Sequence, residues 1–129
     1  MSEPRQRTDR QIVGQCAEEI AVRFLREQGL EVLLRNYRAR LGELDVVARE
    51  RETLAIVEVR SRASDLYGGA AASVTWAKQR RIARAAARLL GQRRELSSLK
   101  VRFDVMVVHA PLTARPRVEW LRHAFTSRL

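Results

Sequence analysis

The sequence predicts an α/β fold: a mixed five-stranded sheet flanked by helices, in the order αβββαββ. Residues 12–28 carry apolar side chains at helical spacing, and residues 76–90 repeat that pattern. Between them, residues 44–59 form two apolar, β-branched runs separated by a charged stretch, which is typical of a β-hairpin. Helices that alternate with strands in this way are expected to cover the faces of one sheet.

The N-terminal residues differ in composition from the rest of the chain. Residues 1–10 are polar, hold three arginines and show no periodicity, so we expect a flexible basic arm or a terminus without a role. Residues 11–129 are expected to form a single domain, because 129 residues suit one domain and suffice to bury a core.

The first helix is expected over residues 12–28, ending at Gly29. Its apolar stripe consists of Val13, Cys16, Ala17, Ile20, Ala21 and Phe24. Cys16 lies within the stripe, which favours core packing over redox chemistry. Glu18 lies at the edge of the stripe, where a carboxylate is usually solvated.

Three strands and a loop follow. Residues 31–37 alternate as a strand does, and residues 44–48 and 54–59 form the hairpin. The loop over residues 61–75 contains two consecutive glycines and should flank the end of the hairpin, with Ser73 or Thr75 capping the next helix.

Two acidic residues interrupt the apolar runs of the hairpin. Asp45 lies near the start of one strand and Glu58 near the end of its antiparallel neighbour, so the two carboxylates can be adjacent. Arg60 shares the Glu58 face, because alternate strand residues point the same way. Such a patch is costly unless a metal or substrate occupies it. Glu43 would share the Asp45 face, as an accessory acid or as an exposed residue.

The helix over residues 76–90 has two contrasting faces. Its inner face consists of Ile82, Ala85, Ala86 and Leu89, and its outer face of Arg80, Arg81, Arg84 and Arg88. No acidic residue occurs between positions 66 and 94, and a one-sign face of this length predicts contact with phosphates. Lys78, in the first turn, could reach toward the carboxylates.

The C-terminal part is expected to hold two strands, over residues 102–109 and 118–125, the second at a sheet edge. Asp104 falls opposite the apolar side of the first, and we expect it to pair with a neighbouring arginine.

Composition narrows the classes of function. The formal net charge of +10 favours a polyanionic partner, although an arginine-rich, soluble surface would explain it too. Cys16 is the only cysteine, which excludes an internal disulfide and fits a cytoplasmic location. One cysteine and two histidines argue against structural zinc. No apolar run approaches the roughly 18 residues of a membrane span, so no membrane partner is expected.

The hairpin motif resembles a known metal site. Asp45, a gap of about a dozen residues and then Glu58-x-Arg60 is similar to the motif of the PD-(D/E)xK nucleases, which have the restriction-endonuclease-like fold. The wider pattern resembles the YraN family of small bacterial proteins, itself similar to archaeal Holliday-junction resolvases. That pattern comprises Gly14, Glu18-x-x-Ala21-x-x-Phe24-Leu25, Gly29, Arg35-Asn36-Tyr37-Arg38, Gly42-Glu43-Leu44-Asp45, Val57-Glu58-Val59-Arg60-x-Arg62, Lys78 and Arg102-Phe103-Asp104-Val105. The family has Lys where this chain has Arg60.

The resemblance implies a set of roles within one endonuclease-like domain. Asp45, Glu58 and the carbonyl of Val59 would hold Mg²⁺ or Mn²⁺, because these hard cations prefer oxygen ligands. Glu18 would join the catalytic set by positioning a water molecule there. Arg60 would neutralise phosphate charge, but it cannot act as a general base because its pKa stays above about 12.

The nucleic-acid-binding set is expected to comprise Arg62, Lys78, Arg80, Arg81, Arg84 and Arg88. Three hypotheses follow: a Mg²⁺-dependent DNA endonuclease selective for DNA structure; a nuclease-fold nucleic-acid-binding module with little or no catalysis; and a basic protein-interaction subunit. The sequence leaves branched DNA, single strands, ends and RNA open as substrates. A homodimer is possible by analogy with the resolvases.

Overall fold

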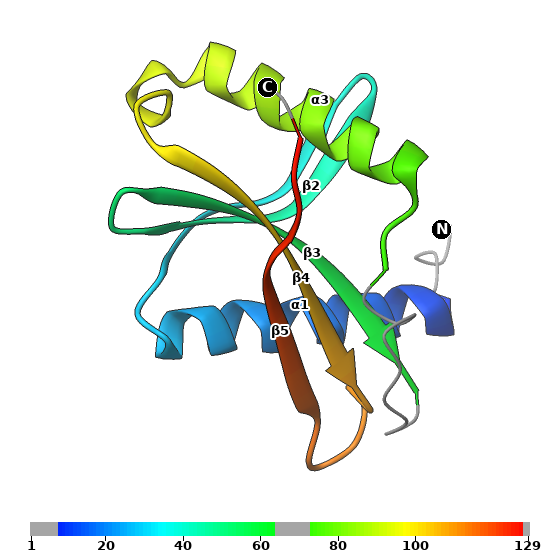
Figure 1. The fold of residues 1–129 in the computed structure, drawn as a ribbon. Helices are drawn as coiled ribbons and strands as arrows, with labels where there is room; N and C mark the ends of the chain where they lie inside the picture. Colours follow the sequence, from blue (N-terminus) through cyan, green and yellow to red (C-terminus); the bar gives the residue numbers. More distant parts are fainter. Residues whose placement is uncertain (1–7, 64–72, 128–129) are drawn as a thin grey trace, which may run out of the picture.

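A five-stranded mixed sheet lies between two helices, which confirms the predicted order and is consistent with a restriction-endonuclease-like fold (Figure 1). The computed structural model describes residues 8–63 and 73–127. The elements are α1 (Asp9–Glu27), β1 (Glu31–Ala39), β2 (Gly42–Glu50), β3 (Thr53–Arg62), α3 (Trp76–Gln92), the short 3₁₀ helix η1 (Arg94–Leu96), β4 (Lys100–His109) and β5 (Arg117–Phe125).

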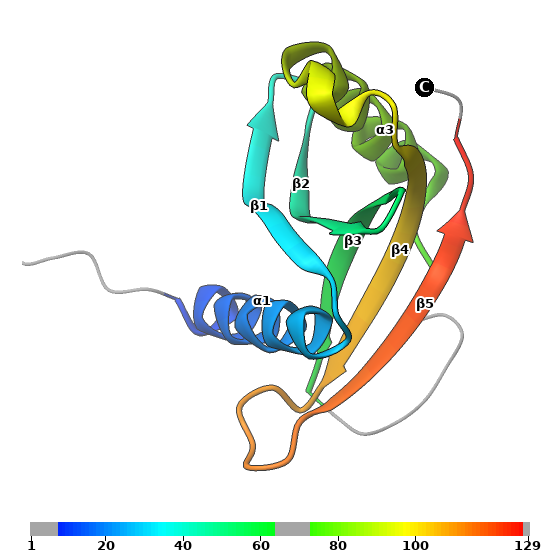
Figure 2. The same cartoon turned by 90° about the vertical axis from the view of Figure 1, so that its left-hand side faces the viewer.

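The strands follow one another across the sheet in chain order, from β1 to β5. Among the five described strands, only β3 and β4 pair in parallel, and the connection between them contains α3. A parallel pair needs such a long crossover, whereas the antiparallel pairs are joined by short turns. Figure 2 shows the resulting twisted sheet from the side, with the two helices on opposite faces.

The alternation of strand side chains builds a separate apolar core under each helix. Leu54 and Ile56 of β3 pack with Ile82 and Leu89 on the α3 side. Their neighbours in β3, including Val57, pack against α1 on the other side. The central strands are therefore apolar on both faces, which is the pattern expected of strands covered by helices on both sides.

Helix α1 begins three residues earlier than predicted. Thr8 caps it: the Thr8 hydroxyl accepts from the Gln11 backbone N–H at 3.2 Å, and the Gln11 side chain accepts from the Thr8 N–H at 2.9 Å. This reciprocal pair satisfies free N–H groups of the first turn. Arg10, which was expected in a basic arm over residues 1–10, therefore belongs to the helix. The rest of the expected arm, residues 1–7, lies outside the described residues.

The buried stripe of α1 is rotated relative to the predicted one. Its buried residues are Ala17, Ala21, Val22 and Leu25, whereas Val13, Cys16, Ile20 and Phe24 are only partly buried. The small side chains of Ala17 and Ala21 let the helix lie close to the sheet. Because Glu18 follows Ala17 on this side, its side chain is drawn toward the sheet and is only 14% exposed.

The later elements extend the predicted boundaries. Strand β3 continues to Arg62, so the loop expected from residue 61 begins after it, and the two glycines of that loop lie outside the described residues. Thr75 caps α3 as predicted, since its hydroxyl accepts from the Lys78 N–H at 3.2 Å.

No helix within residues 8–63 and 73–127 is both long enough and apolar enough to cross a membrane.

Asp104 confirms the predicted pairing with a neighbouring arginine. The carboxylate is fully buried and accepts from the Arg102 guanidinium at 2.8 and 2.9 Å. It also accepts from the Trp120 indole N–H and the His123 backbone N–H, each at 3.0 Å. These donors make the acid a structural link between β4 and β5.

Gly42 lets the β1–β2 turn approach α3 closely. A Cβ atom at this position would overlap the backbone carbonyl group of Arg81, with the carbonyl carbon at 2.9 Å. Because the obstructing atoms belong to a helix backbone, no side-chain rotation relieves the overlap. The absence of a side chain at Gly42 therefore sets how near the second strand lies to the helix.

Replacing Gly42 with Ala should lower the free energy of unfolding by about 1–3 kcal/mol, because α3 and the turn must separate. Urea denaturation measures this. Gly91→Ala is the matched control: nothing lies within 4 Å of its added methyl group, and alanine in a helix should stabilise by roughly 0.5–1 kcal/mol. Equal effects at the two glycines would contradict the close approach.

Candidate active site

Asp45 lies where β2 parts from β3. The paired residues of the two strands end at Val46 and Val57; one further step in this register would oppose Asp45 to Glu58. The Asp45 carboxylate instead accepts a hydrogen bond from the Val59 backbone N–H at 2.9 Å. The carbonyl of Val59 faces the same gap, because the N–H and C=O groups of one strand residue point to the same neighbouring strand.

The alternation of β2 also changes at this point. Leu44 and Val46 are two residues apart, yet Leu44 packs on the α3 side and Val46 on the α1 side. Close to Asp45 in β1 stands Asn36, whose φ of 52° is uncommon within a strand. Asp45 consequently lies between the two faces and lines a cavity of about 370 Å³ beneath α3 and one of about 180 Å³ beside α1.

Glu58 and Lys78 meet in the cavity beneath α3. The Lys78 ammonium lies 2.7 Å from a carboxylate oxygen of Glu58, whose side chain is 7% exposed. Lys78 can reach it because the first turn of α3 directs this residue to the same inner side as Ile82. The structure therefore places Asp45, Glu58 and Lys78 around one cavity, with Arg38 and Arg81 at its wall.

Arg60 shares the Glu58 side of β3, as the alternation predicts, but its guanidinium donates to the backbone carbonyl of Ser73. Ser73 lies two residues before Thr75, the N-cap of α3. Arg60 is not among the described residues that line the cavity beneath α3. The structure thus links Arg60 to the segment that leads into α3.

Glu18 lies on the other side of the gap. It accepts from the Arg35 guanidinium at 3.1 Å and from the Asn36 amide at 2.9 Å. It shares with Asp45 and Val59 the wall of the smaller cavity, beside α1. The structure therefore brings Glu18 to Asp45 from the face opposite to Glu58 and Lys78.

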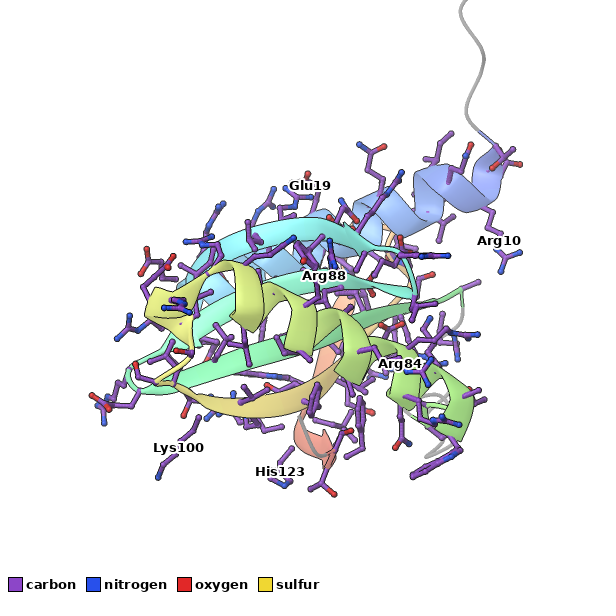
Figure 3. The ribbon with its side chains drawn as sticks, turned by 90° about the horizontal axis from the view of Figure 1, so that it is seen from above. Arg10, Glu19, Arg84, Arg88, Lys100 and His123 are labelled. Atoms are coloured by element: carbon purple, nitrogen blue, oxygen red, sulfur yellow. The ribbon has the colours of Figure 1, made fainter. Side chains whose placement is uncertain are left out.

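The predicted phosphate-binding arginines of α3 lie along its outer side, where Arg80, Arg84 and Arg88 are exposed. Figure 3 looks down on this helix, with Arg84 and Arg88 labelled along it. Arg62 lies elsewhere: it is half-buried at the end of β3, where its guanidinium donates to the Ser61 carbonyl at 2.7 Å. The side chain of Glu43 is exposed, 3.9 Å from Arg38, and lines the larger cavity.

Burial raises the pKa of Asp45 to about 7, from an ordinary value of 3.8. Removal of the carboxylate from water is the largest cause, followed by the negative charge of neighbouring Glu58. The N–H of Val59 and the charge of Lys78 act in the opposite direction and offset part of the rise. Asp45 and Glu58 share a hydrogen bond in this gap and repel each other when both are ionised. A divalent cation bound between two such carboxylates would offset their repulsion.

The donor set fits a hard divalent cation. Asp45 and Glu58 supply two adjacent carboxylates, and the Val59 carbonyl faces the same gap. Mg²⁺ needs only one or two protein carboxylates because it retains several waters. Within residues 8–63 and 73–127 no group of three or more acidic, histidine or cysteine side chains forms a larger metal cluster.

Sequence reasoning missed several contacts of this site. It expected Lys78 to reach toward the carboxylates but did not identify Glu58 as its partner. It also did not place Arg38 at the cavity, or Arg35 and Asn36 as hydrogen-bond donors to Glu18. The sequence signals for Lys78 were its place in the family pattern and a positive charge in the first helical turn, where the helix dipole makes a cation unfavourable.

Comparison with known proteins places the chain among uncharacterised relatives. Residues 17–108 match the model of the uncharacterised protein family UPF0102. A UPF0102 protein of Alkalilimnicola ehrlichii is 47% identical over 88% of this chain and 86% of its own length. One of Herminiimonas arsenicoxydans is 45% identical over 95% and 94%, and one of Frankia casuarinae 46% identical over 88% and 95%.

The raised pKa of Asp45 makes stability depend on pH. Between pH 4 and 7 the folded state retains a proton that the unfolded state has lost, so stability falls as the pH rises through this window. Asp45→Asn removes the charge and can still accept from the Val59 N–H. At pH 8 this variant should be more stable than the wild type, by roughly 2–4 kcal/mol.

Urea denaturation at pH 4 and pH 8 measures the difference. The advantage of Asp45→Asn should be small at pH 4, where the wild-type carboxyl group is protonated in the folded state. If Asp45→Asn and the wild type unfold with the same free energy at pH 8, the ionised Asp45 carboxylate does not destabilise the fold.

Proposed function

The chain belongs to the UPF0102 family, whose description names no activity, and we propose from the site itself that it is a Mg²⁺-dependent DNA endonuclease. One observation carries the proposal: Asp45, Glu58 and Lys78 converge on one cavity beneath a helix whose outer side is lined with arginines. Membership of this family also bears out the motif resemblance to the YraN proteins.

Asp45, Glu58 and the Val59 carbonyl are the groups that would hold the ion, as Mg²⁺ prefers oxygen ligands. When bound, Mg²⁺ supplies charge relief at the phosphate and lowers the pKa of water. Glu18, held by Arg35 and Asn36, approaches Asp45 from the other face and would orient a water molecule there.

Lys78 takes the role that the motif gives to residue 60. Its ammonium lies 2.7 Å from Glu58, so it would neutralise charge on a phosphate that enters the cavity. A lysine can also lose its proton when desolvated, whereas an arginine cannot. Arg60 would act mainly by holding the segment before α3, through its bond to Ser73, and thereby positioning Lys78.

The arginines of α3 would bind the DNA backbone near the site. Arg81 lines the cavity, and Arg80, Arg84 and Arg88 continue the basic face away from it. A helix of this length without any acidic residue attracts phosphates through charge, with affinity that depends on salt.

A second candidate is a nucleic-acid-binding module with little or no catalysis. The observation that favours it is the Arg60 guanidinium, which replaces the usual lysine and is bonded to Ser73 rather than directed into the cavity. Metal-dependent nicking of DNA distinguishes the two candidates.

Lys78→Ala should lower cleavage by about 10²–10⁴-fold if Lys78 takes part in proton transfer or charge relief. Arg60→Ala should lower it less, because Arg60 acts through position. Single-turnover cleavage of labelled four-way junctions and single strands, with Mg²⁺ or Mn²⁺, measures both. The matched control is Lys100→Ala. Lys100 is an exposed lysine at the start of β4, where it lies opposite Thr53 and not beside Glu58.

Wild-type activity in Lys78→Ala would exclude the proposed role of this lysine. Absence of cleavage in the wild-type protein with either metal, together with salt-dependent DNA binding, would favour the binding module. Binding of neither DNA form would contradict both candidates.

Replacement of Arg80, Arg81, Arg84 and Arg88 with Gln should weaken DNA binding and flatten its salt dependence. The log–log slope should fall by about 0.9 for each duplex phosphate that the helix no longer neutralises. Fluorescence anisotropy over a range of salt concentrations measures the slope. Gln at Arg23 and Arg26, exposed on α1, is the control and should leave it unchanged. An unchanged slope in the α3 variant would mean that this face does not contact DNA phosphates.

A further inference from the structure

An exposed tryptophan begins the arginine face of α3. Trp76 is the first residue of the helix and is 72% exposed. Side chains of this size are normally buried at least in part, and three other large apolar residues among those described are exposed to a lesser degree. Packing against residues 8–63 and 73–127 therefore does not account for its presence there.

The spacing puts Trp76 in line with the arginines. Trp76, Arg80, Arg84 and Arg88 are each four residues apart, so they are neighbours along one row of the helix surface. Successive members rise by about 6 Å along the helix axis. All four residues are exposed, so the outer side of α3 carries one row that begins with an aromatic ring and continues with positive charges.

That combination fits a single strand of DNA. Single-strand-binding surfaces combine cations that track the phosphates with aromatic rings on which bases stack. A paired base in a duplex has its faces covered by its neighbours, whereas an unpaired base offers a free face. We infer that Trp76 stacks on an unpaired base of a DNA strand whose phosphates lie along Arg80, Arg84 and Arg88.

The row also relates this base to the candidate active site. Trp76 and Lys78 belong to the same first turn of α3, with Lys78 on the inner side against Glu58. An unpaired base on Trp76 would thus mark the segment of strand that passes closest to the cavity. The inference rests on the proposed DNA-binding function and specifies its substrate class: DNA with unpaired bases next to the bond that is cleaved.

The test compares two probes of equal length, a fluorescein-labelled oligothymidine and a labelled blunt-ended duplex of two strands, by fluorescence anisotropy at one salt concentration. Trp76→Ala should weaken binding of the oligothymidine by about 5–150-fold, the range that corresponds to the removal of one stacking partner. Trp76→Phe should retain part of the affinity, since a smaller ring still stacks. Binding of the duplex should be unchanged in both.

Leu112→Ala is the control, because Leu112 is 61% exposed in the turn between β4 and β5, away from α3. It should not alter the affinity for either probe. Intrinsic fluorescence gives a second readout: oligothymidine should quench the wild type and Trp120→Phe but not Trp76→Phe, even if Trp120→Phe is less stable.

The outcomes separate the inference from the function it rests on. Equal loss of single-strand and duplex affinity in Trp76→Ala, or no loss, would overturn the stacking role and leave DNA binding intact. Failure of the wild-type protein to bind either probe would overturn both.

Discussion

The partly buried carboxylate of Asp45 is the constraint around which the candidate site is arranged. A carboxylate withdrawn from water next to a second one destabilises the fold, unless nearby groups compensate. Here the Val59 N–H donates to Asp45 and the Lys78 ammonium contacts Glu58. Both contacts depend on the gap where β2 parts from β3, since continued pairing of the two strands would fill that space.

Asp104 shows that burial alone does not make an acid a candidate for catalysis. It is as deeply buried as any side chain in the described part of the chain, but a guanidinium, an indole and a backbone N–H all donate to it. Asp45 has instead another acid beside it, and its pKa is raised to about 7. The partners of each carboxylate therefore make Asp104 a structural link and Asp45 a candidate for catalysis.

Helix α3 couples the site to the surface. Its inner side brings Lys78 to Glu58, and its outer side carries the row from Trp76 to Arg88. Gly42 permits the close approach of the helix to the sheet, and Arg60 holds the segment that precedes it. A shift of this helix would therefore change the site and the proposed DNA-binding face together, because both belong to one rigid element.

The sequence by itself determined the order of the elements, the two-faced character of α3 and the pairing of Asp104 with an arginine, because these follow from local periodicity and charge. It also placed Asp45 and Glu58 on neighbouring strands, since a hairpin fixes which residues can be opposite. Only the tertiary structure decided that Lys78 contacts Glu58, that Arg60 bonds to Ser73, and that Arg35 and Asn36 hold Glu18. These contacts join residues 13 to 20 positions apart in the sequence. Their formation depends on where β2 parts from β3 and on how closely α3 approaches the sheet, which no periodic pattern encodes.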